Sequence, residues 1–373
     1  MRQDLRTSIA AVLTVMLVTA VVLTLVTPAH ATFPGKNGRI AFGQFTGPNG
    51  GDIFTMNPDG SDVRQLTFFG SNGGSTGLGD WSPDGNELVF SQQSSPSEPI
   101  QLWTMNADGS NQHLLLDDAS DNDSGASFSP DGTQIVFHRC PINAAFFQCA
   151  VYRVNADGSK LTSITPINSN HDIIDLEPAY SKDGRTIAFE SLWRDGLIEA
   201  IYLMNADGSS IRSLTPPALG AHGGNWSPDE SNIVFSSNDG GPGAFVLSQE
   251  IWLISSDGHK TTRLTFTNNQ WHGIDTAPRD LAPSWSPQGD AIVFERNSPD
   301  GSQSSIYVMN RDGSNQKLIL KVPAHRAASL PMRNRIPGTR QTNSDGLKVI
   351  EQGGFFPRWG PAPKDAQHDR NVH

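Results

Sequence analysis

The stretch "WSPDGNELVF" at residues 81–90 places a tight turn directly before a short apolar segment. Ser82 suits the first corner of a type I turn, Pro83 fixes φ at the second corner, and Gly85 accepts the left-handed conformation that ends the turn. The same pattern returns as "FSPDGTQIVF" (128–137), "YSKDGRTIAF" (180–189), "WSPDESNIVF" (226–235) and "WSPQGDAIVF" (285–294). Self-similarity of this kind indicates a repeat architecture.

A second turn motif alternates with the first. It reads "MNPDGSDVRQLT" at 56–67 and recurs as "MNADGSNQHLLL" (105–116), "VNADGSKLTSIT" (154–165), "MNADGSSIRSLT" (204–215), "ISSDGHKTTRLT" (254–265) and "MNRDGSNQKLIL" (309–320). The residues before each turn are β-branched and aromatic, which is typical of strands. Several of these strands are apolar without alternation, which indicates that both of their faces are covered.

Each repeat therefore predicts four strands separated by tight turns. Four-stranded units of about 40–50 residues are typical of β-propeller blades. We expect an all-β fold, a six-bladed β-propeller spanning residues 37–361, followed by a tail at 362–373.

The two ends of the repeat region complement each other. The first unit begins at "NGRIAF" (37–42) without an aromatic-ended strand, whereas "FFPRWGP" (355–361) carries such a strand with no unit after it. The C-terminal strand would complete the N-terminal blade and remove an exposed sheet edge. The alternative is a broken repeat with no structural role. Closure gives six aromatic repeat anchors: Trp81, Phe128, Tyr180, Trp226, Trp285 and Trp359.

These two motifs resemble the TolB-like β-propeller repeat, a family related to WD repeats. The resemblance covers roughly residues 37–361. It implies the propeller fold and, as the function we expect, a binding or protein-interaction module. The family's repeat also serves a few enzymes, so the alternative is a propeller-type, metal-dependent polysaccharide lyase or hydrolase.

Residues 1–31 have the features of a secretory signal. Arg2 and Arg6 precede an apolar run from Ile9 to Val26, and Ala29-His30-Ala31 is a small-x-small cleavage site. We expect a secreted or periplasmic protein of the cell envelope, with an uncleaved N-terminal membrane anchor as the alternative. In such a compartment Cys140 and Cys149 are expected to form a disulfide.

The formal charge is −11, which argues against a nucleic acid partner because nucleic acids require a basic face. We expect a monomer that binds a protein, a peptide or an envelope glycan. In a propeller, the loops between blades and between the middle strands share one face, and here they differ in length and sequence, as functional loops do.

Candidate ligand-binding residues lie in these variable loops. Trp193 and Trp271 would stack on a sugar ring or a peptide side chain, or else anchor their own loops. The other candidates are His171, His222, His272, Asp275 and Arg279. Propeller-type oligogalacturonate lyases resemble this repeat and bind a metal through histidines between blades. Here the three histidines lie at different distances from their anchors and share no register. The two alternatives are a bound divalent metal and solvated loop histidines.

Two further segments stand out. "DDASDNDS" (117–124) has calcium-like spacing of acidic residues but lacks the terminal Glu of a calcium loop, so we expect a solvated loop. Residues 322–354 form a long basic connection, which is either a flap over the variable loops or a surface loop. We find no coherent catalytic set and expect no catalytic residues.

Overall fold

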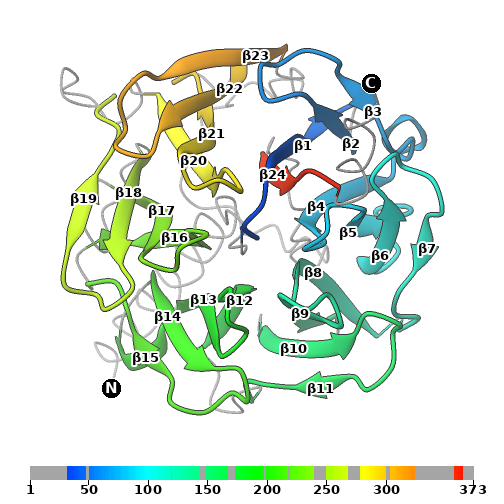
Figure 1. Cartoon of the computed structure of the whole chain (residues 1–373). Coiled ribbons are helices and arrows are strands. Elements are labelled where there is room, and N and C mark those ends of the chain that lie inside the picture. The colour runs from blue at the N-terminus through cyan, green and yellow to red at the C-terminus, as the bar shows by residue number, and fades with distance from the viewer. Residues whose placement is uncertain are drawn as a thin grey trace, which may run out of the picture. The chain divides into compact units, whose positions relative to one another are not determined.

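The computed structural model describes residues 32–47, 50–118, 120–142, 148–166, 173–196, 199–216, 219–238, 249–267, 278–299, 303–323 and 357–363. These residues form six four-stranded antiparallel sheets arranged in a ring (Figure 1). The all-β, six-bladed propeller is therefore confirmed. The signal segment 1–31 and most of the 322–354 connection lie outside the described residues.

Each sheet is one blade, and each blade runs from an inner strand near the ring centre to an outer strand at the rim (Figure 1). The inner strands of blades 1 to 6 are β24 (Arg358–Pro361), β4 (Ser75–Trp81), β8 (Asp121–Phe128), β12 (Ile174–Tyr180), β16 (Ala221–Trp226) and β20 (Arg279–Trp285). The second strands are β1 (Asn37–Phe45), β5 (Glu87–Gln93), β9 (Gln134–Pro141), β13 (Thr186–Leu192), β17 (Asn232–Asn238) and β21 (Ala291–Asn297).

The third and fourth strands complete each blade. The third strands are β2 (Gly51–Met56), β6 (Gln101–Asn106), β10 (Ala150–Asn155), β14 (Glu199–Asn205), β18 (Gln249–Ser255) and β22 (Gln303–Asn310). The fourth are β3 (Arg64–Gln65), β7 (His113–Leu114), β11 (Thr162–Ser163), β15 (Arg212–Ser213), β19 (Thr261–Arg263) and β23 (Lys317–Pro323). Two short 3-10 turns also occur, η1 (Gly70–Asn72) and η2 (Arg194–Gly196).

The C-terminal strand closes the ring. β24 pairs antiparallel with β1, and Trp359 lies opposite Ile40 in that pairing. Blade 1 therefore joins the last described strand to the first, as expected from the unmatched sequence ends (Figure 1).

The two turn motifs have the hydrogen bonds that their sequences predict. In the first, the Ser82 hydroxyl donates to Asp84 and accepts from the Glu87 N–H, and Gly85 has a left-handed φ of 74°. In the second, the Ser61 N–H and hydroxyl both donate to Asp59. Carboxylates held by local donors in this way fix the turn geometry.

Apolar clusters lie between neighbouring blades. Ile40 and Phe42 of blade 1 pack with Val293 and Ile306 of blade 6, whereas Ala41 of blade 1 packs with the cluster of blade 2. Adjacent residues of one strand are thus buried on opposite sides. This explains why the strand sequences are continuously apolar.

The segment 117–124 differs from the expected solvated loop. β8 begins at Asp121, and Asp123 is buried, with its carboxylate accepting two hydrogen bonds of 2.7 Å from Arg139. The expectation was wrong because the sequence near Asp123 does not reveal its counterion, which comes from the neighbouring strand.

Cys140 and Cys149 form a disulfide. The bond links the end of β9 to the residue just before β10. It therefore holds together the base of the connection between these two strands.

Candidate functional site

The strand order defines two ends of the propeller. The turn face carries the uniform hairpins around Asp84 and Asp59 and their repeats. The loop face is the opposite end, where inner strands begin and where β9 and β13 end. The described candidates of the sequence analysis, Trp193, His222 and Arg279, belong to the loop face or to the strand ends next to it.

The structure describes three of the seven ligand-binding candidates. Trp193 follows β13, whereas His222 and Arg279 lie on the inner strands β16 and β20. The assignment of His222 and Arg279 to loops was wrong, because both belong to regular strand pairings. The remaining candidates, His171, Trp271, His272 and Asp275, lie outside the described residues.

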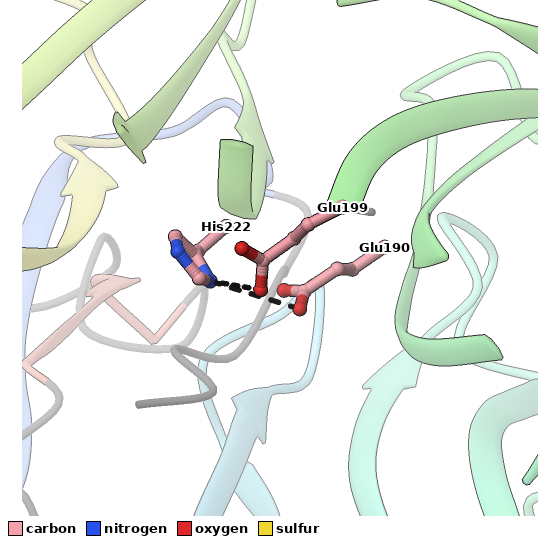
Figure 2. A group of neighbouring side chains, drawn as sticks. All are labelled: Glu190, Glu199 and His222. Carbon is pink, nitrogen blue, oxygen red and sulfur yellow. Dashed lines mark ion pairs between the residues drawn. The ribbon is translucent and has the colours of Figure 1, made fainter. Parts of the chain in front are cut away.

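His222 lies in a buried group with two glutamates of the preceding blade (Figure 2). Its Nδ1 is 2.6 Å from Oε1 of Glu199 on β14 and 3.8 Å from Oε1 of Glu190 on β13. The side chains are between 0 and 5% exposed. Within the described part of the chain, these three residues are the one group of at least three His, Cys, Asp or Glu side chains whose donor atoms lie within 4.8 Å of one another.

The backbone of blade 5 positions Glu190. The N–H of Gly223 donates to Oε2 of Glu190 over 3.0 Å. Gly223 has a φ of 56° at a shift in the β16–β17 register, so a glycine relieves the strain of this conformation. A hydrogen bond from an inner-strand N–H to a second-strand side chain also occurs one blade earlier, where the Glu177 N–H donates to Nδ1 of His138. A second-strand side chain thus satisfies a backbone N–H of the next inner strand.

The ionisable side chains of this group shift one another's pKa values. Burial alone would lower the pKa of His222, but the carboxylates of Glu199 and Glu190 outweigh it and raise that pKa to about 10. Burial raises the pKa of Glu199, against the opposing effect of His222. Two buried carboxylates therefore share one imidazole as their cationic partner within this group.

The neighbouring His138 has the opposite electrostatic character. Burial lowers its pKa to about 3, so the ring is neutral. Its Nδ1 accepts the Glu177 N–H, which leaves Nε2 to donate to Oγ of Ser124 over 2.7 Å. His138 acts here as a structural connector between blades 3 and 4.

Buried carboxylate–arginine pairs hold the strand ends at the loop face. Three of them are Asp123–Arg139, Asp175–Arg194 and Asp280–Arg296, with N–O distances of 2.6–2.9 Å. Each arginine also stacks over a Phe and a Tyr of its own blade. Burial, opposed by the arginine, raises the pKa of Asp123 and Asp280 to about 6. Planar guanidinium groups suit this combination of bidentate pairing and stacking.

Trp193 has an unusual backbone conformation. It is half-buried and has a φ of 58°, a left-handed value that is rare for a bulky residue. The next residue, Arg194, is fixed by Asp175, and its carbonyl oxygen accepts a hydrogen bond from the Tyr202 hydroxyl. The surrounding contacts therefore hold Trp193 in this conformation at the loop face.

Sequence reasoning missed Glu190 and Glu199. Each is a charged residue inside an otherwise apolar strand segment, in "IAFES" and "IEAIYL". An alignment of the repeats draws attention to Glu199, whose position is Gln in blade 5, but not to Glu190, because blade 6 carries Glu295 at the same position.

The comparisons with known proteins agree with this architecture. Residues 148–329 match the family model described as the TolB beta propeller domain. The structure is similar to TolB from Acinetobacter baumannii, with a TM-score of 0.62 and 19% identity over 87% of this chain and 67% of that chain. It is similar to a putative TolB from Agrobacterium tumefaciens, with a TM-score of 0.56 and 20% identity over 78% of this chain and 90% of that chain.

A chain of a nidogen/laminin complex is also similar, with a TM-score of 0.55 and 11% identity over 78% of this chain and 94% of that chain. No curated protein matches the sequence significantly. The structural similarity shows the β-propeller fold, and the match over residues 148–329 agrees with the resemblance of the repeat motifs to the TolB-like family. In the described residues, no helix is long and apolar enough to cross a membrane.

Proposed function

We propose that this TolB-like propeller is a secreted or periplasmic binding module of the cell envelope that docks a partner protein or peptide through its loop face. The observation that carries the proposal is the set of accessible apolar side chains on rigid strand ends at that face. Phe68 and Phe266 are 65% and 55% exposed and lie shortly after the outer strands β3 and β19, which end at Gln65 and Arg263. Ile142 follows β9 and is also exposed.

Rigid support distinguishes these residues from scattered surface apolar residues. The Arg263 guanidinium lies 4.9 Å from the Phe266 ring centroid and is paired with the buried Glu250. Trp193 is fixed by the contacts of Arg194, as described above. Aromatic side chains that are ordered before binding lose little conformational entropy in an interface, which favours their use as anchors.

The alternative function is a metal-dependent polysaccharide lyase or hydrolase. It would use the donors of the Glu190–Glu199–His222 group. The side chains of Glu199 and His222 are only 5% and 3% exposed. This burial favours an interior role for the group over direct contact with a polymer, so we place the docking function first.

Site-specific photo-crosslinking tests the proposal. A photoreactive amino acid is placed at Phe266 on the loop face, or at Leu161 on the turn face as a matched control that is 40% exposed. The full chain is then irradiated in the native envelope extract. We expect a defined partner protein to crosslink from position 266 but not from position 161, and a Trp193→Ala variant to lose it.

Crosslinks from position 161 alone would contradict the proposal, as would a crosslink from position 266 that the Trp193→Ala substitution leaves unchanged. If no protein crosslinks but a glycan array shows binding that Trp193→Ala abolishes, the partner is a glycan instead. Far-ultraviolet circular dichroism of each variant confirms that the propeller remains folded.

A further inference from the structure

We infer that Glu190, Glu199 and His222 form a binding site for one divalent metal ion of the Zn²⁺ or Mn²⁺ type. The site would lie in the interior, between blades 4 and 5. This inference goes beyond the docking function and is independent of it, because none of the three residues is among the exposed side chains at the loop face.

The donor types suit such an ion. Imidazole nitrogen is a common ligand of zinc, and carboxylate oxygen binds both zinc and manganese. Because the three donors come from β13, β14 and β16, they are held by three separate strands of two blades (Figure 2). Paired strands are rigid supports, and ligands on rigid elements retain their geometry better than ligands on loops.

The distances also suit one ion. Ligand bonds of about 2.1 Å in a tetrahedral arrangement place donor atoms about 3.4 Å apart. The distances from Nδ1 of His222 to the two carboxylates are 2.6 Å and 3.8 Å, one shorter and one longer than this separation. Adjustments of about an ångström or less in side-chain positions would therefore bring these pairs to the required spacing.

Glu190 provides an independent indication. Its side chain is fully buried, and its Oε1 accepts no hydrogen bond within the described part of the chain. Burying a carboxylate oxygen without a hydrogen bond costs about 1–3 kcal/mol or more. The Gly223 N–H meanwhile holds Oε2, and such outer hydrogen bonds orient the ligands of metal sites. A metal ion would give Oε1 a closer partner than Nδ1 of His222, which lies 3.8 Å away.

The charge balance points in the same direction. Two carboxyl groups face one imidazole, so when both are ionised their negative charge exceeds the positive charge of a protonated His222. An uncompensated buried charge is costly. A divalent ion with a neutral His222 would balance the two carboxylates.

The experiment uses the full chain, purified without a histidine tag and freed of metal with a chelator. Calorimetric titration with ZnCl₂ and with MnCl₂ is expected to show one ion per chain for at least one of the two metals. Glu199→Gln and His222→Gln should weaken binding at least about tenfold. Gln249→Leu is the matched control, because Gln249 is buried at the register position of Glu199 one blade later, and it should bind like the wild type.

Two further measurements separate loss of a ligand from loss of the fold. The bound metal should raise the thermal unfolding midpoint of the wild type and of Gln249→Leu but not that of Glu199→Gln. Pulsed electron paramagnetic resonance of the Mn²⁺-loaded wild type should show coupling to an imidazole nitrogen that His222→Gln removes. No binding by the wild type, or equal binding by all variants, would overturn the inference.

Discussion

The indole Nε1–H of Trp81 donates a hydrogen bond to the backbone carbonyl oxygen of Arg358, 3.3 Å away. Trp81 is the anchor of blade 2, and Arg358 begins the strand that closes blade 1. A Cβ added to Gly360 would lie 2.4 Å from the Trp81 ring, so the closing strand lies directly against that ring. The closure is therefore fixed both by pairing with β1 and by contact with the following blade.

Truncation of the closing anchor should destabilise the whole propeller. Trp359→Ala removes a side chain that is 6% exposed and packs with Ile40 and Val293. We expect the free energy of unfolding to fall by about 3–5 kcal/mol. Urea unfolding followed by circular dichroism measures the change. A loss below about 1 kcal/mol, the usual size for a tolerated site, would mean that closure adds little to stability.

The threonine of the "LT" motif should be a stability determinant. The Thr215 hydroxyl accepts the Ile201 N–H over 3.0 Å, and the equivalent threonines of blades 1, 3 and 5 do the same for Ile53, Val151 and Ile251. Thr215→Val keeps the shape but leaves this buried N–H without an acceptor, at a cost of about 1–3 kcal/mol.

The control for this substitution is Thr262→Val, on the exposed surface of β19. Chemical denaturation should show a change within about 0.5 kcal/mol for the control. Equal effects of the two substitutions would show that the buried hydrogen bond is not the cause.

His138 should make stability depend on pH. Its pKa is lowered to about 3 in the folded chain by burial, from an ordinary value of 6.5. Between a pH of about 3 and 6.5 the unfolded chain binds a proton at His138 that the folded chain does not. The stability contributed by the buried neutral His138 is therefore present above pH 6.5 and is lost as the pH falls. The slope is at most about 1.4 kcal/mol per pH unit.

A His138→Gln variant isolates this contribution. Its amide can still accept the Glu177 N–H and donate to Ser124, but it does not titrate. Unfolding free energies of both proteins, measured from pH 8 to pH 4, should differ by a constant amount above pH 7. Below pH 6.5 the wild type should lose stability relative to the variant. Parallel curves over the whole range would rule out this role for His138.

The disulfide should add measurable stability. The bond joins cysteines that are nine positions apart. Closing a loop of that size stabilises the folded chain by about 2–3 kcal/mol through restriction of the unfolded chain. Reductant should therefore lower the free energy of unfolding of the wild type and leave a Cys140→Ser, Cys149→Ser double variant unchanged. Insensitivity of the wild type to reductant would contradict this expectation.

The fold could be predicted from the sequence because its determinants are local and repeated. Gly85 and Pro83 specify a turn wherever their motif recurs, and the unmatched Trp359 indicated closure. The buried group could not be predicted, because Glu199 and His222 belong to different blades and only the packing of those blades brings them together.

Polarity also misled the assignment of strand ends. Asp175 and Asp280 are acidic, as loop residues often are, yet both are buried in inner strands. Each is neutralised by an arginine, Arg194 or Arg296, that local sequence does not identify as its partner. A buried ion pair thus resembles a solvated loop when only one of its members is considered.

Closure by β24 has a consequence for the order of events during synthesis. β24 leaves the ribosome after every other strand that the structure describes, so blade 1 waits as a three-stranded sheet while the other blades form. Throughout that time β1 has no neighbour on its inner side and presents unpaired backbone groups that another chain could pair with. The nascent protein is therefore most exposed to aggregation just before β24 emerges, and protection at that stage would matter more than while the earlier described strands form.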